Sequence, residues 1–440
     1  MTDFFHLTNS RIKSLLPKPL VKAIGQVFSA QILFQIMGLV ISLVLVRNLP
    51  KSEYALYTVL MAVSGMLSII SNSGIMIGFK KIGSQIWDDS IAFSELIKTT
   101  LSLRKYLIIF SFLIAGSYAG LILHRQEVPI GENIFFLCSL LFMAIPSANI
   151  GIIRDALLLQ KKIAAVQWTS IINQSIRLIA VITVLLLFKE YLTIKTVLVI
   201  TVIALTSSYF YIKKVQIESL GKPSPIINLE QKATLVKYIK LNWHNSLFFA
   251  FRDQIAILIL GFFGSTGGLA DLGAITRFGL VFLSINALAT NILGPSFGRC
   301  SEKNKLIKMI SITFFGYTIL FFVTLLIVYL FSDELLWLLG PKYSNLNFEL
   351  LLVFTLSLLM LAVEIVNTLN NSKGWIKFSP YFEIPLNILA ITCGILFLDL
   401  TTVSGGLYLT IFSFASILIL YLFNLWYGLK SFNVDGRINE

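Results

Sequence analysis

Twelve apolar runs, each long enough to cross a membrane, constrain this chain more than any other feature. An α-helix rises about 1.5 Å per residue, so about 20 apolar residues span the roughly 30 Å hydrocarbon layer of a bilayer. Of the 440 residues, 56% are apolar and only 13% are charged, which is not the composition of a soluble globular domain. The runs cover residues 24–46, 54–77, 106–123, 134–158, 167–188, 192–212, 241–263, 269–293, 307–331, 346–369, 376–398 and 404–428. We therefore expect an all-α integral membrane protein with about twelve transmembrane helices.

The basic residues indicate how such a bundle is oriented. When the loops are assigned alternately to two sides, most of the 35 Lys and Arg fall on the side that also holds both termini. This bias marks the cytoplasmic side, so we expect both termini in the cytoplasm. Topology and contact with anionic membrane lipids then account for the net charge of +13, and nucleic-acid binding is not expected.

The longest connection divides the runs into six before it and six after it. It covers residues 213–240 and contains Gly221, Pro223 and Pro225 among charged residues, which is typical of a linker. We expect an N-terminal six-helix lobe over 1–212, a cytoplasmic linker over 213–240 and a C-terminal six-helix lobe over 241–440. An even number of spans per lobe gives both lobes the same orientation, as in transporters whose central cavity lies between two lobes.

Three arginines lie deep inside the apolar runs. Arg177, Arg252 and Arg277 are about 12 to 15 Å from the nearest membrane surface, where an unpaired charge costs several kcal/mol unless it faces a cavity or a partner. One alternative is pairing with a carboxylate, and Asp253 lies at comparable depth. On an ideal helix Asp253 points about 100° away from Arg252, so we expect it to serve a neighbouring helix. At least one arginine should then face an aqueous cavity, where a guanidinium suits a phosphate or diphosphate ligand.

Polar residues recur on the same helix faces as these arginines. Their spacings of four or seven residues place each set on one side of a helix. The candidate binding residues are Asn173 beside Arg177, Asn245 beside Arg252, Ser284 and Asn291 beside Arg277, and the pair Gln31 and Gln35. The alternative for the uncharged members is interhelical hydrogen bonding that only holds the bundle together. Asp253 and Glu364 are the candidate charge partners or ion-coupling residues.

Cysteine and histidine contribute no further site. Cys138 and Cys393 lie in apolar runs and Cys300 in a loop, so neither a disulfide framework nor a metal site is expected. No cofactor is expected either.

Three segments resemble helices of a known transporter family. They are LVRNLPKSEYALYTVLMAVSGMLSIISNSGI from Leu45, RDALLLQKKIAAVQWTSIINQSIRLIAVITVLLL from Arg154 and FRDQIAILILGFFGS from Phe251. They look like the corresponding helices of Wzx-type O-antigen and polysaccharide flippases, which belong to the multidrug, oligosaccharidyl-lipid and polysaccharide (MOP) exporter superfamily. Span number, loop lengths and the six-plus-six division extend the resemblance over nearly the whole chain.

The resemblance implies a function and a location. A protein of this family would move an undecaprenyl-diphosphate-linked oligosaccharide from the cytoplasmic to the periplasmic leaflet of a bacterial inner membrane. Its two lobes would rock around a cationic central cavity, into which Arg177, Arg252 and Arg277 would project. The resemblance also implies a polysaccharide polymerase and a chain-length regulator as partners, in lipopolysaccharide or related polysaccharide biosynthesis. Protons or sodium ions are the candidate coupling ions.

Two other classes of function stay open. A drug or cation antiporter of the same superfamily, of the multidrug and toxin extrusion (MATE) type, would share the fold, but its pocket should be acidic. A membrane enzyme, such as a polysaccharide polymerase or an acyltransferase, is less favoured. A polymerase usually has a large periplasmic loop, whereas the longest connection here is expected in the cytoplasm. Catalysis is not suggested by the histidines either, since His6 lies in the N-terminal tail, His124 at a helix end and His244 without a nearby acid. The sequence therefore favours a transporter over an enzyme.

Overall fold

The computed structural model describes residues 18–221 and 224–432, with side chains described from residue 31 onward except that of Asn291. These residues form helices joined by short turns, as the apolar runs predict. The helices of the N-terminal half are α2 (Lys18–Asn48), α3 (Lys51–Asn72), α4 (Ile75–Ile86), α5 (Ser90–Ser111), α6 (Ser117–Arg125), α7 (Ile130–Leu159), α8 (Ile163–Leu187) and α9 (Ile194–Leu220). A π-helical turn, η1 (Phe112–Gly116), joins α5 to α6 without interrupting the span.

The C-terminal half has more breaks in its helices. Its elements are α10 (Leu229–Arg252), α11 (Ile255–Phe263), α12 (Thr266–Ile275), η3 (Thr276–Val281), α13 (Phe282–Leu288), η4 (Ala289–Leu293), α14 (Gly294–Arg299), α15 (Lys303–Leu330), α16 (Ser332–Leu339), α17 (Asn347–Lys373), α18 (Ser379–Phe397) and α19 (Val403–Ser431). In the described residues, eleven helices are long and apolar enough to cross a membrane, or twelve when α10 and α11 count as one span bent by 59°. The prediction of an all-α membrane protein with about twelve spans is confirmed.

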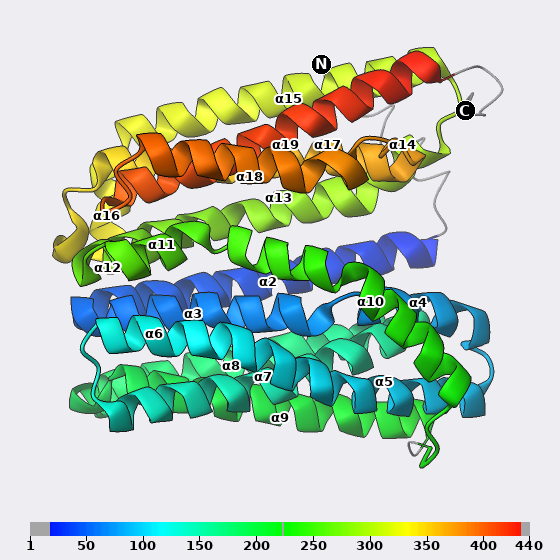
Figure 1. Cartoon of the computed structure of the whole chain (residues 1–440), viewed down its shortest axis with the longest axis horizontal. Helices are drawn as coiled ribbons and strands as arrows, with labels where there is room; N and C mark the ends of the chain where they lie inside the picture. The colour runs from blue at the N-terminus through cyan, green and yellow to red at the C-terminus, as the bar shows by residue number, and fades with distance from the viewer. Residues whose placement is uncertain (1–17, 222–223, 433–440) are drawn as a thin grey trace.

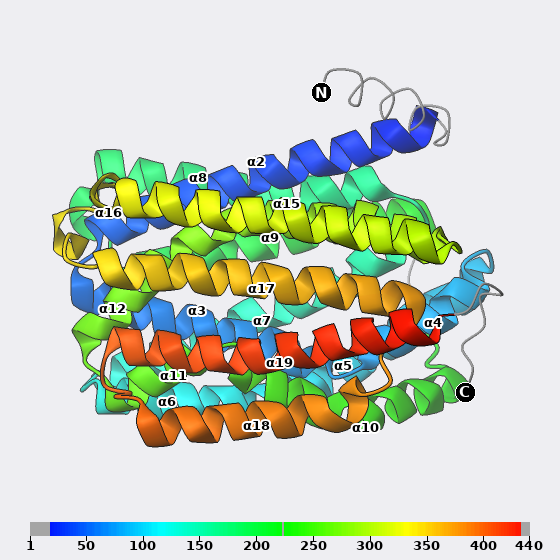
Figure 2. The ribbon, with the colours of Figure 1, turned by 90° about the horizontal axis from the view of Figure 1, so that it is seen from above.

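Figure 1 shows two groups of helices lying side by side, one built from α2 to α9 and the other from α13 to α19, with α11 and α12 between them and α10 running across the α2–α9 group. In Figures 1 and 2, α2 begins and α19 ends at the same end of the bundle. This agrees with an even number of crossings. That this end is cytoplasmic remains a prediction from the basic residues.

Helices occupy most of the segment that we expected to be a linker. Of residues 213–240, only 221–228 lie between helices, because α9 continues to Leu220 and α10 begins at Leu229. Asn228 caps α10, since its side-chain oxygen accepts hydrogen bonds from the backbone N–H groups of Glu230 and Gln231, both at 3.1 Å. The backbone N–H of Asn228 also donates to Thr99 Oγ1 at 3.1 Å, and Leu235 is fully buried in the core around α4 and α5. The first part of α10 is therefore held against the N-terminal half, and the division of the chain into lobes stays a prediction.

A second difference concerns the basic segment between the second and third runs. The gap between the apolar runs 54–77 and 106–123, together with its basic residues, predicts a cytoplasmic loop over residues 78–105, but these residues lie almost entirely in α4 and α5. The chain turns before them at Gly74, whose φ of +76° suits glycine. A Cβ at this position would lie 2.5 Å from the backbone oxygen of Tyr238, so α10 approaches the turn closely. The basic residues of this segment therefore lie on packed helices, where one of them, Arg104, is buried.

Apart from those of α10, contacts between the two halves gather at the end of the bundle that holds α12 and α16. Helix α12 packs on α3 so tightly that a Cβ on Gly273 would lie 2.0 Å from Thr58 Oγ1. Lys51 Nζ lies 2.6 Å from Asp271 Oδ1, and Lys342 Nζ donates to the backbone oxygen of Leu49 at 2.9 Å. We call this end, where residues 47–58 meet residues 271–277 and 337–343, the closed end.

Candidate functional site

Two tyrosines of α3 organise the interface between the halves. Tyr54 and Tyr57 are both buried, and their ring centroids lie 5.9 Å apart. The Tyr54 hydroxyl donates to the backbone oxygen of Gly273 on α12 at 3.2 Å. A buried tyrosine hydroxyl needs such a partner, and its oxygen still has capacity to accept a hydrogen bond.

Arg277 reaches this tyrosine pair from the C-terminal half. It lies in η3, where the single helix expected over 269–293 is interrupted by a 3₁₀ segment. Its Nε donates to the Tyr54 hydroxyl at 3.1 Å, and its guanidinium carbon lies 5.9 Å from the centroid of the Tyr57 ring. An arginine over an aromatic face in this range gains a cation–π attraction without being neutralised.

Arg177 reaches the same pair from α8 in the N-terminal half. Its Nη2 donates to the Tyr57 hydroxyl at 3.4 Å, and its Nη1 donates to Gln174 Oε1 at 3.3 Å. Within the described part of the chain, neither Arg177 nor Arg277 forms an ion pair with a carboxylate. The structure thus brings two predicted arginines to one tyrosine pair, with neutral partners that leave both charges uncompensated. We call Tyr54, Tyr57, Arg177 and Arg277 the interface cluster.

Gln35 and Ser284 meet farther along the interface. The Ser284 hydroxyl, on α13, makes a hydrogen bond with Gln35 Oε1 on α2. Gln35 Nε2 is buried and has no hydrogen-bond partner among the described residues. An acceptor atom of a ligand would satisfy this donor. Gln31 lies half-buried one turn earlier on α2, and the Asn291 side chain lies outside the described residues. These four positions therefore remain candidate binding residues.

Arg252 has a different environment from the other two arginines. Its Nε and Nη2 both donate to Asp253 Oδ1, at 2.9 and 2.6 Å, and its guanidinium carbon lies 4.2 Å from the centroid of the Phe414 ring. Our expectation that Asp253 would serve a neighbouring helix is wrong. Helix α10 ends at Arg252, and the break before α11 releases Asp253 from ideal helical geometry. Arg252 is only 9% exposed and is paired within its own chain segment.

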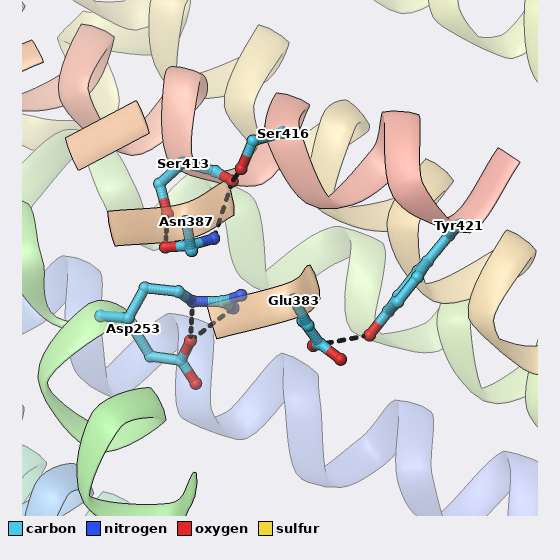
Figure 3. A network of polar contacts seen from close by, with 7 residues as sticks. Asp253, Glu383, Asn387, Ser413, Ser416 and Tyr421 are labelled. Carbon is cyan, nitrogen blue, oxygen red and sulfur yellow. Dashed lines mark hydrogen bonds and ion pairs between the residues drawn. The ribbon is translucent and has the colours of Figure 1, made fainter. Parts of the chain in front are cut away.

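Two further carboxylates lie near this pair. Glu364 on α17 interacts electrostatically with both Asp253 and Arg252, and Glu383 on α18 interacts with Arg252. Glu383 Oε1 also accepts a hydrogen bond from the Tyr421 hydroxyl at 2.9 Å, as Figure 3 shows. We call Arg252, Asp253, Glu364 and Glu383 the acidic cluster. Glu383 escaped the sequence analysis, although its place inside the run 376–398 was a signal that could have found it.

Uncharged residues of α18 and α19 form hydrogen bonds beside the acidic cluster (Figure 3). In Figure 3, Asn387 of α18 lies between Ser413 of α19 and the ion pair that includes Asp253. Asn387 Nδ2 donates to the backbone oxygen of Ser413 at 3.1 Å, and Ser413 Oγ donates to Asn387 Oδ1 at 2.9 Å. This reciprocal pair is an interhelical contact that stabilises the packing of α18 on α19. Asn245 lies half-buried two turns before Arg252 on α10.

Two polar cavities lie toward the end opposite the closed end. One, of about 450 Å³, is a half-open pocket among helices of the N-terminal half and includes Asn173 in its lining. The other, of about 650 Å³, lies between α14 and α17 and is lined by Glu364, Asn367 and Arg299 among others. Asn173 therefore faces a cavity of its own half, although it lies one turn from Arg177.

The fold is shared with solved membrane transporters. The lipid II flippase MurJ, in an inward closed conformation, aligns with a TM-score of 0.65 at 15% identity over 93% of this chain and 88% of its own. An inward-facing MATE transporter of the MOP superfamily aligns with a TM-score of 0.61 at 12% identity, over 90% of this chain and 93% of its own.

A third structure is that of a MOP superfamily transporter from Pyrococcus furiosus, described as having a binding pocket of reversed polarity. It aligns with a TM-score of 0.59 at 13% identity, over 93% of this chain and 95% of its own. No protein-family model and no curated protein sequence matches the chain. The chain has the fold of the MOP superfamily transporters and is a multi-pass membrane protein.

Proposed function

We propose that this protein is a flippase that moves an undecaprenyl-diphosphate-linked oligosaccharide, such as an O-antigen or related polysaccharide unit, from the cytoplasmic to the periplasmic leaflet of a bacterial inner membrane. The observation that carries the proposal is the pair Arg177 and Arg277, which come from opposite halves and have only neutral partners. Two guanidinium groups around one tyrosine pair suit a diphosphate, because each offers a fork of donors to phosphate oxygens. The flippase MurJ shares the fold, which supports a lipid-linked substrate.

The distribution of contacts between the halves supports an alternating-access cycle. Ion pairs, hydrogen bonds and the close approach at Gly273 hold the closed end together, whereas each half has a polar cavity toward the other end. With the predicted orientation, the closed end is periplasmic and the cavities face the cytoplasm, where the substrate is made. Separation of α12 from α3 would then open the periplasmic side.

The acidic cluster is the proposed binding site for a coupling ion. Asp253, Glu364 and Glu383 surround one arginine, so the cluster has more carboxylates than cations. A bound proton or sodium ion would balance the excess negative charge of the cluster. Release of that ion would change the contacts that hold α10, α17 and α18 together. A polysaccharide polymerase and a chain-length regulator are the proposed partners of the flippase.

A MATE-type antiporter is the second candidate, and the same acidic cluster favours it. A pocket for organic cations needs uncompensated carboxylates, and a MATE transporter shares the fold. The two candidates differ in which cluster meets the substrate, the interface cluster for an anion or the acidic cluster for a cation.

A gene deletion separates the two functions. Lipid-linked glycans of the deletion strain are extracted and assigned to leaflets with a membrane-impermeant glycan-modifying reagent. A flippase predicts undecaprenyl-diphosphate-linked units that accumulate on the cytoplasmic leaflet, restored to normal by the wild-type gene. Unchanged glycans together with hypersensitivity to cationic drugs would instead support the antiporter.

A further inference from the structure

The cavity inside the N-terminal half is separate from the interface cluster. Helices α2, α3, α4, α5, α7, α8 and α9 line it, and its volume of about 450 Å³ is within the usual range for small-ligand sites. Four charged residues face it, namely Lys80, Arg104, Arg154 and Asp155. Three of these are cationic and one is acidic, so the cavity has an excess of positive charge.

Arg104 is the unusual member of this group. Its residue is only 2% exposed, and it is among the largest fully buried side chains of the described structure. Its Nε and Nη1 are buried and have no hydrogen-bond acceptor among the described residues. Native structures rarely leave buried charged donors unpaired, because desolvation without a compensating bond opposes folding. Arg104 therefore needs an acceptor that is not part of the described chain.

The one carboxylate in the cavity does not meet that need. Asp155 Oδ2 lies 3.0 Å from Lys80 Nζ, and Asp155 Oδ1 lies 3.5 Å from Arg154 Nε. Asp155 interacts electrostatically with Arg104 as well, but no hydrogen bond joins the two side chains in the described structure. Both Asp155 oxygens are already shared with other cations, so Asp155 does not supply the hydrogen-bond acceptor that Arg104 lacks in the described structure.

A second residue of the cavity lining also carries a buried donor without an acceptor in the described part of the chain. Asn173 Nδ2, on α8, is buried and has no acceptor among the described residues. Together with the two nitrogen atoms of Arg104, it makes three buried donors on residues that line one half-open cavity. A ligand that offers several acceptor oxygens and a negative charge would satisfy all three, whereas a carboxylate offers fewer oxygens than a phosphate.

We propose that this cavity binds a phosphate-type oxyanion, held by Arg104 and Asn173. Lys80 and Arg154, which also line the cavity, add positive charge around the bound anion. The site does not depend on the flippase proposal, since it is built wholly within one half and excludes Arg177 and Arg277. Its phosphate belongs either to an anionic lipid headgroup or to a soluble phosphate compound. The chemistry recognised is the same for both sources.

Binding of inorganic diphosphate to the purified full-length protein in neutral detergent tests the site by titration calorimetry. The test variant is Arg104→Met, and the matched control is Lys105→Met, the next residue of α5, which is exposed and does not line the cavity. We expect wild type and Lys105→Met to bind alike, and Arg104→Met to bind at least about tenfold more weakly. Arg104→Lys should recover part of the affinity, because lysine keeps the positive charge but lacks the planar, two-pronged set of donors of the guanidinium group.

A second arm identifies the source of the phosphate. The protein is placed in nanodiscs of phosphatidylcholine alone or with phosphatidylglycerol, and the diphosphate titration is repeated. If a lipid headgroup occupies the cavity, phosphatidylglycerol weakens diphosphate binding to wild type and leaves that of Arg104→Met unchanged. If a soluble phosphate is the ligand, wild-type affinity is the same in both discs.

Two results would overturn the site. The first is the absence of diphosphate binding in detergent together with no dependence of wild-type thermal stability on phosphatidylglycerol, which would mean that water fills the cavity. The second is wild-type affinity in Arg104→Met combined with loss of binding in Arg277→Ala, which would assign the signal to the interface cluster. Failure of the flippase proposal would appear in glycan export and would leave this binding measurement unchanged.

Discussion

The interface cluster and the acidic cluster place arginines at similar depths but give them opposite electrostatic settings. Arg177 and Arg277 have hydroxyl and amide partners, which accept hydrogen bonds without cancelling charge. Arg252 has a carboxylate at 2.6 Å and two more carboxylates nearby. A deep arginine is therefore not by itself evidence for an anion site. Its partners decide whether the charge is available to a ligand.

Removal of Arg277 should produce the largest effect on transport. Arg277→Ala deletes from the interface cluster a guanidinium that has no carboxylate partner among the described residues, and hydrogen bonds to charged groups contribute about 1.5–3 kcal/mol each. Loss of two such bonds predicts export lower by on the order of 100-fold, with normal protein abundance. Export is measured as surface polysaccharide at matched expression, and Arg277→Lys should retain part of it. Full export by a well-expressed Arg277→Ala would show that the interface cluster does not hold the substrate.

Removal of Arg252 should lower the amount of folded protein in the membrane more than it lowers transport per folded molecule. Arg252→Met leaves Asp253 beside two other carboxylates. Because Asp253 is exposed, loss of this ion pair should cost less than the about 3–5 kcal/mol of a fully buried pair. We expect a several-fold loss of folded protein in the membrane, measured by fluorescence-detected size exclusion. The double variant Arg252→Met with Asp253→Asn should recover abundance. Normal abundance of the single variant would contradict the pairing.

A side chain at Gly273 should loosen the closed end. A Cβ there would lie 2.0 Å from Thr58 Oγ1, so Gly273→Ala forces α12 away from α3. We expect cysteines introduced at Lys51 and Asp271 to form a disulfide at least a few times more slowly in Gly273→Ala than in the parent. The matched control is Gly316→Ala on α15, where a Cβ meets nothing within 4 Å. An equal rate in all three proteins would show that this approach does not hold the end closed.

The smallest effect is expected from the tyrosine hydroxyl between the two arginines. Tyr57→Phe keeps the ring but removes the oxygen that accepts from Arg177 Nη2 at 3.4 Å. A bond of this length is weak, so we expect export to change no more than a few-fold. Because both arginines stay charged, a loss as large as that of Arg277→Ala would mean that the hydroxyl itself contacts the substrate.

Hydropathy predicts the spans well because membrane helices must be long and apolar. It cannot identify a charged helix that packs inside one half, and for this reason residues 78–105, with Arg104, were expected in a loop. Ideal helical geometry likewise separates Arg252 from Asp253, but the break after Arg252 joins them. The roles of Tyr54 and Tyr57 depend on contacts between α3, α8 and η3, which lie far apart in the sequence.

The contrast between the two clusters is tested most directly by lipid binding. Purified wild type, Arg277→Ala and the double variant Arg252→Met with Asp253→Asn are titrated with undecaprenyl diphosphate in the same detergent, with undecaprenyl alcohol as the control lipid. We predict at least about tenfold weaker diphosphate binding for Arg277→Ala, near wild-type binding for the double variant, and no preference of Arg277→Ala for diphosphate over the alcohol. Wild-type binding by Arg277→Ala with loss of binding in the double variant would contradict the assignment of the anion site to the interface cluster.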